Sequence, residues 1–209
     1  MPDRFLHGHL EFKRTHFDQR ESLIRLAREG QYPLALYIGC SDSRVVPELL
    51  TGAAPGEIFV VRNVAAYVPP REHADSSVGA AIEYALGPLG VRHLVVCGHT
   101  GCGGIKAALH GTETLPAGMT ELREWLTDIE RSIAPAKECA LEGEARLTRA
   151  VEESVLSSLS HLADYPVVGE KLDDGTLQLH GWIYDMQAVA LRAYDPDKDA
   201  FVDVEALLR

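Results

Sequence analysis

Short apolar runs alternate with segments of helical periodicity in the first half of the chain. Leu34–Gly39 and Glu57–Arg62 are rich in aliphatic residues and bounded by turn residues, which is typical of strands buried on both faces. Arg92–Cys97 is a third such run, and Ser76–Leu86 before it places its apolar residues at helical spacing. This succession of strand, helix and strand predicts a mostly parallel sheet with right-handed crossovers.

The two ends of the chain carry different patterns. Glu11–Arg28 is a charged segment with scattered apolar residues and Gly30 behind it, which predicts an N-terminal helix. Thr176–Tyr184 alternates apolar and polar residues, and Ala188–Tyr194 can pair with it as a hairpin or meander. We therefore expect an N-terminal helical arm over residues 1–30 and an added edge strand or hairpin at the C-terminal end of the sheet.

The region between the third strand and the C-terminal hairpin has a helical pattern. Residues 102–110 and 118–134 are predicted helices, and regularly spaced aliphatic residues from 147 to 162 mark a long amphipathic helix. Residues 112–118 and 135–143 are expected surface connections. No internal repeat or low-complexity linker divides the sequence, so we expect one α/β domain over residues 1–209, with a mostly parallel central sheet flanked by helices.

Composition narrows the class of protein. The chain has 209 residues, 46% of them hydrophobic, and a formal net charge of -11. This charge argues against a general partner of nucleic acids or anionic membranes, which call for clustered Lys and Arg. The first residues lack the apolar stretch of a signal peptide, and no run of about 18 apolar residues occurs. We expect a soluble, cytoplasmic protein that acts on a small substrate.

Three potential metal ligands follow two of the predicted strands. Cys40 comes directly after the first strand, and His99 and Cys102 come after the third. Because sites in parallel sheets form at the carboxyl ends of the strands, the three side chains are expected at one edge. Two thiolates and one imidazole suit zinc, and a fourth position would be left for water or a carboxylate, as in catalytic zinc sites. An isolated His-x-x-Cys pair would be weak evidence, because both residue types also occur near strand ends for packing alone.

Asp42 and Arg44 add a possible control of the fourth position. Asp42, two residues after the first cysteine, can accept a hydrogen bond from zinc-bound water or can itself coordinate the metal. Arg44 can hold the same carboxylate in a bidentate ion pair. The pair therefore predicts a switch, in which the fourth position is open when Asp42 is on Arg44 and blocked when Asp42 is on zinc.

The remaining cysteines and histidines have simpler interpretations. Cys97 lies in an apolar run and is expected to be a small core residue, and Cys139 lies in a polar segment without ligand spacing. Several histidines also lack a partner at ligand spacing and are expected to be structural or surface residues. They are His93, His110, His161 and His180.

Four stretches resemble the motifs of β-class carbonic anhydrases, in the same order and at compatible spacing. They are Cys40-Ser-Asp-Ser-Arg44, Pro55–Asn63, Ile82-Glu-Tyr84 and Gly98–Gly104. The resemblance implies that Cys40, His99 and Cys102 bind Zn²⁺. It also implies that Asp42 and Arg44 are the catalytic dyad.

The implied reaction is the reversible hydration of carbon dioxide to bicarbonate and a proton through zinc-bound hydroxide. By the same resemblance, Gln31 orients the substrate, while Phe59 and Tyr84 line an apolar pocket. Pockets of this family lie at a dimer interface, which implies a homodimer or a dimer of dimers with the N-terminal arm packed on the partner subunit. From the residues alone, Gln31 can equally be a polar residue ending the first helix, and the two aromatic residues can be core or interface residues.

Members of the family divide by regulation. Some bind bicarbonate at a non-catalytic pocket that favours the closed state, and these carry a Trp three residues before the first cysteine. The corresponding residue here is Tyr37, although Arg62 and Tyr184 are present and Gly39 resembles the regulated group. The resemblance favours the constitutively open form, with Asp42 paired with Arg44 near pH 8.

Two other functions are compatible with the same residues. Relatives in this family hydrolyse carbon disulfide, a chemistry that calls for a long apolar tunnel, which nothing in this sequence predicts. A non-catalytic zinc protein permanently closed by Asp42 is the other possibility. The presence of Arg44 counts against it, because a structural site has no need of an arginine that draws off a ligand.

Overall fold

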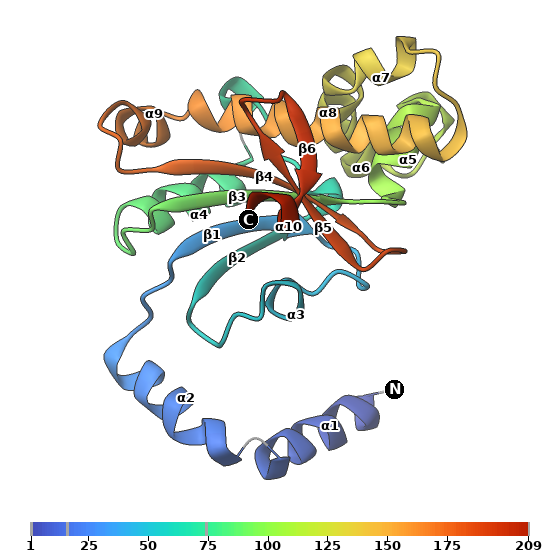
Figure 1. Cartoon of the computed structure of the whole chain (residues 1–209). Coiled ribbons are helices and arrows are strands. Elements are labelled where there is room, and N and C mark those ends of the chain that lie inside the picture. The colour runs from blue at the N-terminus through green and yellow to red at the C-terminus, as the bar shows by residue number, and fades with distance from the viewer. Residues whose placement is uncertain (1, 16, 74, 209) are drawn as a thin grey trace.

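A single twisted sheet forms the centre of the molecule. The computed structural model describes residues 2–15, 17–73 and 75–208 (Figure 1). Within them, six strands lie in the order β2-β1-β3-β4-β5-β6. The first four in this order are parallel, whereas β5 and β6 continue the sheet antiparallel to β4 and to each other. The mostly parallel sheet and the C-terminal hairpin are thus confirmed. The strands are β1 Ala35–Cys40, β2 Ile58–Asn63, β3 His93–His99, β4 Gln178–Asp185, β5 Ala190–Asp195 and β6 Ala200–Asp203.

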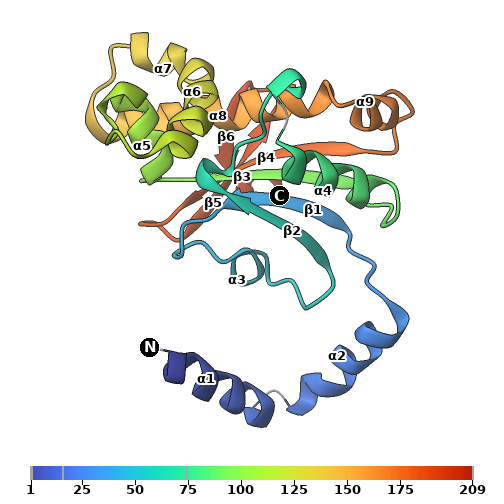
Figure 2. The same cartoon turned by 180° about the vertical axis from the view of Figure 1, so that it is seen from behind.

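Helices connect the parallel strands and flank the sheet (Figure 2). The helix predicted over Ser76–Leu86 has these bounds, and Asp75 caps it by accepting hydrogen bonds from the first turn. The long amphipathic helix is also present. The helices are α1 Pro2–Thr15, α2 Phe17–Glu29, α3 Pro47–Thr51, α4 Ser76–Leu86, α5 Gly103–His110, α6 Thr120–Ser132, α7 Ala134–Glu138, α8 Gly143–Ala163, α9 Pro166–Asp173 and α10 Val204–Leu207.

The core is divided between the two faces of the sheet. Successive side chains of a strand point to opposite faces. Leu36 and Leu94 lie in the larger cluster, together with Ile82 of α4 and apolar residues of α5, α6 and α8. Tyr37 and Cys97 lie in a smaller cluster on the other face. Cys97 is fully buried, which confirms the expected small core residue.

Two predicted elements at the start of the chain need correction. The single helix expected over Glu11–Arg28 is instead two helices, α1 and α2, and His16 lies outside the described residues. Helix α1 begins earlier because Pro2 suits a first helical turn, and because Phe5 and Leu6 extend the apolar pattern. Strand β2 is half-buried along most of its length rather than buried on both faces, because it is the edge strand of the sheet in this chain.

The expected surface connection over residues 135–143 was partly wrong. Ala134–Glu138 forms α7, with Pro135 in its first turn and Ala136 fully buried. The sequence pattern also did not predict α3, α9, β6 or α10. These elements have between four and eight residues, which is too short for a reliable period of apolar positions.

The N-terminal arm lies apart from the sheet. Figures 1 and 2 both show α1 and α2 outside the body of the molecule, beyond α3. Several apolar side chains of α1 are largely in solvent, with Phe5 69%, Leu6 65% and Leu10 56% exposed. Within the described part of the chain, no helix has the length and apolar character needed to cross a lipid bilayer.

Candidate metal centre

Two strand ends and one helix start bring the three predicted ligands together. Cys40 is the last residue of β1, and His99 is the last residue of the neighbouring parallel strand β3. Cys102 immediately precedes α5. The three ligand atoms lie within 4.8 Å of one another, and the two sulfurs are 4.0 Å apart. All three residues are buried.

The donor set fits a soft divalent cation such as zinc. His99 Nδ1 donates to the backbone oxygen of Thr100 at 3.0 Å, which leaves the lone pair on Nε2. That Nε2 atom is buried and has no hydrogen-bond partner, so its lone pair is available to a metal. Two sulfurs bound to one tetrahedral zinc at about 2.3 Å would be roughly 3.8 Å apart, close to the separation found here.

The two sulfurs shift each other's pKa in opposite directions. The contact with Cys102 lowers the pKa of Cys40, whereas the same contact, together with burial, raises the pKa of Cys102. Two thiolates side by side are therefore disfavoured on their own, and a divalent cation would supply the positive charge that offsets them. Backbone amides also face them, since Asp42 N donates to Cys40 Sγ at 3.4 Å and the amides of Gly104 and Ile105 donate to Cys102.

Asp42 and Arg44 form an ion pair at the edge of this cluster. Arg44 donates from Nε to Asp42 Oδ1 at 2.9 Å and from Nη2 to Oδ2 at 2.6 Å, and its backbone N donates to Oδ1 at 3.0 Å. These hydrogen bonds hold the pKa of Asp42 well below its usual range. Asp42 Oδ2 is 3.9 Å from His99 Nε2. The carboxylate is thus beside the ligands but oriented by the arginine.

Arg62 is a supporting residue whose contacts the sequence did not reveal. Its Nε donates to Cys40 O at 2.9 Å, and its Nη2 donates to Asp42 O at 2.6 Å. The guanidinium therefore fixes the backbone that carries one ligand and the carboxylate. The position of Arg62 in β2 could have identified this residue, because it lies opposite Gly39, next to Cys40, in the parallel register.

Tyr37 and Gly39 depend on each other. A Cβ atom at Gly39 would lie 2.6 Å from Cε1 of the Tyr37 ring, so only glycine leaves room for the tyrosine in this position. The Tyr37 hydroxyl is buried without a hydrogen-bond partner, and burial raises its pKa far above the usual range. The ring packs edge-on against Trp182, with 6.4 Å between centroids.

The residues predicted for the substrate pocket lie at the opposite end of the sheet. Phe59 is paired with Leu36 near the start of β1, and its ring is 5.8 Å from that of Tyr84. Phe59 precedes the end of β2 by four residues, a separation of roughly 13 Å along the strand. Gln31 is exposed between α2 and β1, and Tyr84 is 48% exposed. Within one chain, these residues are therefore not assembled with the metal ligands.

The histidines without ligand spacing have local partners. His93 Nδ1 and His180 Nε2 are 3.1 Å apart between β3 and β4. His110 and His161 donate from Nδ1 to the backbone oxygens of Lys106 and Val68, at 2.7 and 2.8 Å. Among the described residues, the Cys40, His99 and Cys102 group is the one cluster of three side chains that could hold a metal ion.

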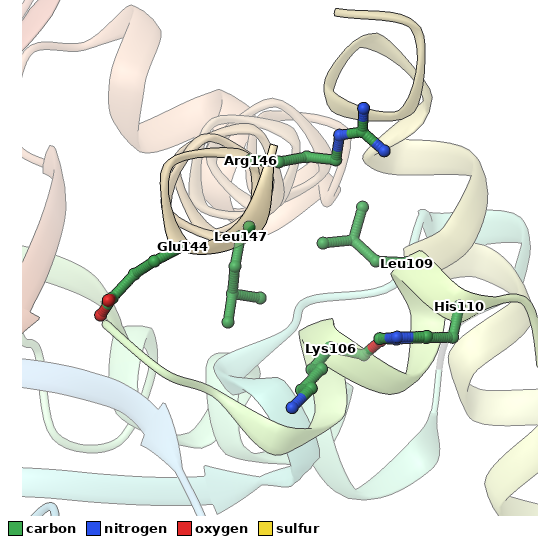
Figure 3. Close-up of a pocket in the computed structure, with 7 residues that line it drawn as sticks. Lys106, Leu109, His110, Glu144, Arg146 and Leu147 are labelled. Atoms are coloured by element: carbon green, nitrogen blue, oxygen red, sulfur yellow. The ribbon is translucent and has the colours of Figure 1, made fainter. Parts of the chain in front are cut away.

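Two of the pockets differ in whether site residues line them. One, of about 370 Å³, is lined by Arg44, Thr100 and Tyr184, among others, and therefore adjoins the ion pair. The other, of about 530 Å³, lies between α5 and α8, where Figure 3 shows Leu109 and Leu147 extending into the space between the helices. None of the predicted site residues lines this second pocket.

The fold places two thiols and one imidazole, a group that could hold one metal ion, at the carboxyl edge of an α/β sheet. A family model described as carbonic anhydrase matches residues 35–191. The chain therefore belongs to the β class of the carbonic anhydrase family of enzymes, which are metal-dependent.

Individual relatives are similar to this chain along nearly its whole length. A carbonic anhydrase of Pseudomonas aeruginosa is 41% identical over 201 residues, covering 94% of this chain and 89% of that protein. The carbonic anhydrase of Synechocystis sp. is 37% identical, with coverages of 92% and 70%. The solved structure of the β-carbonic anhydrase CcaA aligns with a TM-score of 0.90 at 36% identity and covers 96% of this chain and 98% of that one. A Coccomyxa β-carbonic anhydrase solved with acetazolamide aligns with a TM-score of 0.77 at 28% identity, with coverages of 97% and 96%.

Proposed function

We propose that this protein catalyses the zinc-dependent, reversible hydration of carbon dioxide to bicarbonate and a proton, and that Asp42 and Arg44 control the fourth zinc position. One observation carries the proposal. The buried side chains of Cys40, His99 and Cys102 lie together, beside an Asp42 carboxylate that accepts two hydrogen bonds from the Arg44 guanidinium. Cys40, His99 and Cys102 would hold the metal. When bound there, zinc would lower the pKa of a coordinated water to about 7 and so provide a nucleophile at neutral pH.

Asp42 would orient a water at the fourth metal position. Its carboxyl group stays ionised at neutral pH because Arg44 holds its pKa low. It could therefore accept a hydrogen bond from the O–H of that water without taking up the proton. The position of Oδ2, 3.9 Å from His99 Nε2, places the acceptor next to the ligands.

Arg44 would keep the carboxylate off the metal. Three hydrogen bonds join Arg44 to the Asp42 carboxylate, whereas the nearest approach of that carboxylate to His99 Nε2 is 3.9 Å. Our hypothesis is that this arrangement persists in the zinc-loaded protein near pH 8. A crystal structure of that protein at about pH 8 with four protein ligands on zinc would contradict it.

A second copy of the chain would complete the substrate pocket. Gln31, Phe59 and Tyr84 lie at the amino end of the sheet, too far to serve the metal centre of their own chain. In a symmetric dimer, each copy would present this end to the partner's metal centre. The pocket residues would then be supplied across the interface, in a homodimer or a dimer of dimers. The similar structures include tetrameric β-carbonic anhydrases from Sordaria macrospora.

The N-terminal arm would contribute to the same assembly. Phe5, Leu6 and Leu10 are mostly exposed in the single chain, and their burial on a partner subunit would be favourable. Residues 1–209 would then act as one domain whose first 30 residues belong to the interface. We also place the protein in the cytoplasm, because all four cysteines are free and a reducing compartment keeps such thiols available to a metal.

Stopped-flow measurement of carbon dioxide hydration with a pH indicator tests the proposal. Zinc-loaded wild type should exceed the uncatalysed rate, and Asp42→Ala should lose about a hundredfold or more in kcat while retaining its zinc. Asp195→Ala removes a carboxylate that accepts from Asp197 N at 3.1 Å in the turn after β5, and it should retain most of the activity. Zinc-loaded wild type without activity would show that the proposed reaction is wrong.

A further inference from the structure

The loop that follows β2 has an unusual backbone. Ala65 and Ala66 both have positive φ values, 71° and 55°. Residues with a Cβ atom rarely adopt this left-handed conformation, and two in succession persist only where their surroundings enforce it. Both alanines are buried, with 6% and 2% of their surface exposed. The loop is therefore held by specific contacts.

Asn63 supplies the principal contact. Its Nδ2 donates to Tyr67 O at 2.8 Å, and its Oδ1 accepts from Tyr67 N at 2.9 Å, so that one side chain bridges the loop from end to end. The indole of Trp125 adds a hydrogen bond to Val64 O at 2.9 Å. Asn63 is the single asparagine of the sequence. An aspartate, which the chain uses at other turns, could not donate to Tyr67 O.

The loop packs directly on the start of α5. A Cβ atom placed on Gly104 would lie 2.9 Å from Val64 Cγ1 and 3.1 Å from the Cβ atom of Ala65. The backbone of Gly104 is therefore in close contact with the strained loop. The amide of the same residue donates to Cys102 Sγ. A change in the conformation of the loop would thus shift Gly104 and, through its amide, the sulfur of Cys102.

The other sulfur ligand is adjacent to Asn63 by strand pairing. Asn63 lies opposite Cys40 in the parallel register of β1 and β2. Its backbone oxygen accepts a hydrogen bond from Ser41 N at 2.8 Å, immediately after the cysteine. Asn63 consequently contacts the strand end that carries Cys40 and, through its loop, the helix start that carries Cys102.

We propose that Asn63 is a positioning residue for the metal centre. Its side chain maintains the left-handed loop, and the loop fixes Gly104 and hence the sulfur of Cys102 at its distance from Cys40. The inference rests on the zinc site of the proposed function. It assigns to Asn63 a role in metal affinity, without contact to metal or substrate.

The zinc dissociation constant, measured by competition with a chromophoric chelator, tests this role. Asn63→Ala removes both hydrogen bonds without adding charge and should weaken zinc binding roughly tenfold or more, as is usual for residues that orient metal ligands. Ala66→Gly in the same chain should restore affinity to within about threefold, because glycine adopts a positive φ without support. The thiolate-to-cobalt absorption of the Co²⁺-substituted protein should change in the single variant and return in the double variant.

Ser132→Ala is the matched control. It removes the hydrogen bond between Ser132 Oγ and the Tyr67 hydroxyl, 2.8 Å long, while leaving the bridge from Asn63 intact. This variant should bind zinc within about threefold of wild type, as expected for a change that does not alter ligand positions. A tenfold loss in this control would mean that general destabilisation near Tyr67 is sufficient, which would overturn the assignment.

The outcomes separate this inference from the proposed function. Wild type that binds no zinc would refute the proposed function itself. Wild type that binds zinc, with Asn63→Ala binding equally tightly, would refute the positioning role alone. Where Asn63→Ala does not fold by itself, recovery of folding and affinity in the double variant supports the role, and a double variant that remains unfolded or weak contradicts it.

Discussion

The two ends of the sheet differ in how complete they are. At the carboxyl end, Cys40, His99 and Cys102 are buried, and Arg44 and Arg62 fix the backbone and carboxylate around them. At the amino end, the residues assigned to the substrate lie on the surface or in a half-buried edge strand. This difference supports our proposal that one chain supplies all three metal ligands of a site, whereas its substrate-binding end serves another copy.

The largest expected effect comes from removing a ligand at the carboxyl end. Cys102→Ala should lose stoichiometric zinc and fall to the uncatalysed rate of carbon dioxide hydration, because two donors are too few to hold the metal at a catalytic site. Metal analysis of the purified protein and stopped-flow assays measure both quantities. Cys97→Ala is the control, since this thiol is buried outside the ligand cluster and should leave zinc content unchanged. Equal zinc in both variants would contradict the assignment of ligands.

A charge in the N-terminal arm should weaken the dimer. Leu10→Asp replaces a side chain that is 56% exposed in the single chain and that we assign to the interface. Loss of a buried leucine costs about 2 kcal/mol, and a symmetric dimer loses two of them, so the dimer dissociation constant should rise roughly a thousandfold. Sedimentation equilibrium measures it. Lys13→Ala, on the same helix, should have little effect, and a Leu10→Asp dimer as tight as wild type would exclude the arm from the interface.

The sequence was sufficient to predict the elements that have a regular spacing of apolar residues over many positions, and the sites that carry a motif. Ser76–Leu86 and the parallel strands follow directly from apolar spacing, and the ligand cluster follows from placing Cys40 and His99 at neighbouring strand ends. The role of Arg62 could not be predicted, because it depends on hydrogen bonds to backbone oxygens, which a sequence pattern does not show. The half-buried state of β2 was missed for a similar reason, since strand order decides which strand is at the edge.

A smaller effect is expected at the amino end. Gln31→Ala should lower kcat/KM for carbon dioxide roughly tenfold with zinc content unchanged, because it removes a hydrogen-bonding group that orients the substrate and not a group that reacts. Gln178→Ala is the matched control, since this glutamine is also exposed at the amino end of a strand. Similar losses in both variants would mean that the effect is not specific to the substrate pocket.

The smallest effect concerns pH and the histidine pair at the same end. Burial and the nearby His93 lower the pKa of His180 in the folded protein. The stability contributed by neutral His180 is therefore complete above the ordinary histidine pKa of about 6.5 and is lost as the pH falls through the lower folded value. Between pH 7.5 and 5, wild type should lose about 2 °C more in Tm than His180→Gln, by differential scanning calorimetry. Equal losses of Tm in the two proteins would show that His180 does not contribute to the pH dependence of stability.

The most direct test of the difference between the two ends is complementation between two defective chains. Cys102→Ala lacks the metal centre, and Gln31→Ala lacks the substrate-orienting group, but a mixed dimer would contain one site with both. Random pairing of equal amounts makes half of the dimers mixed, so the mixture should show about a quarter of the wild-type activity after reassociation. If the mixture shows only half of the activity of Gln31→Ala alone, each chain uses its own Gln31, and the proposed exchange between copies is wrong.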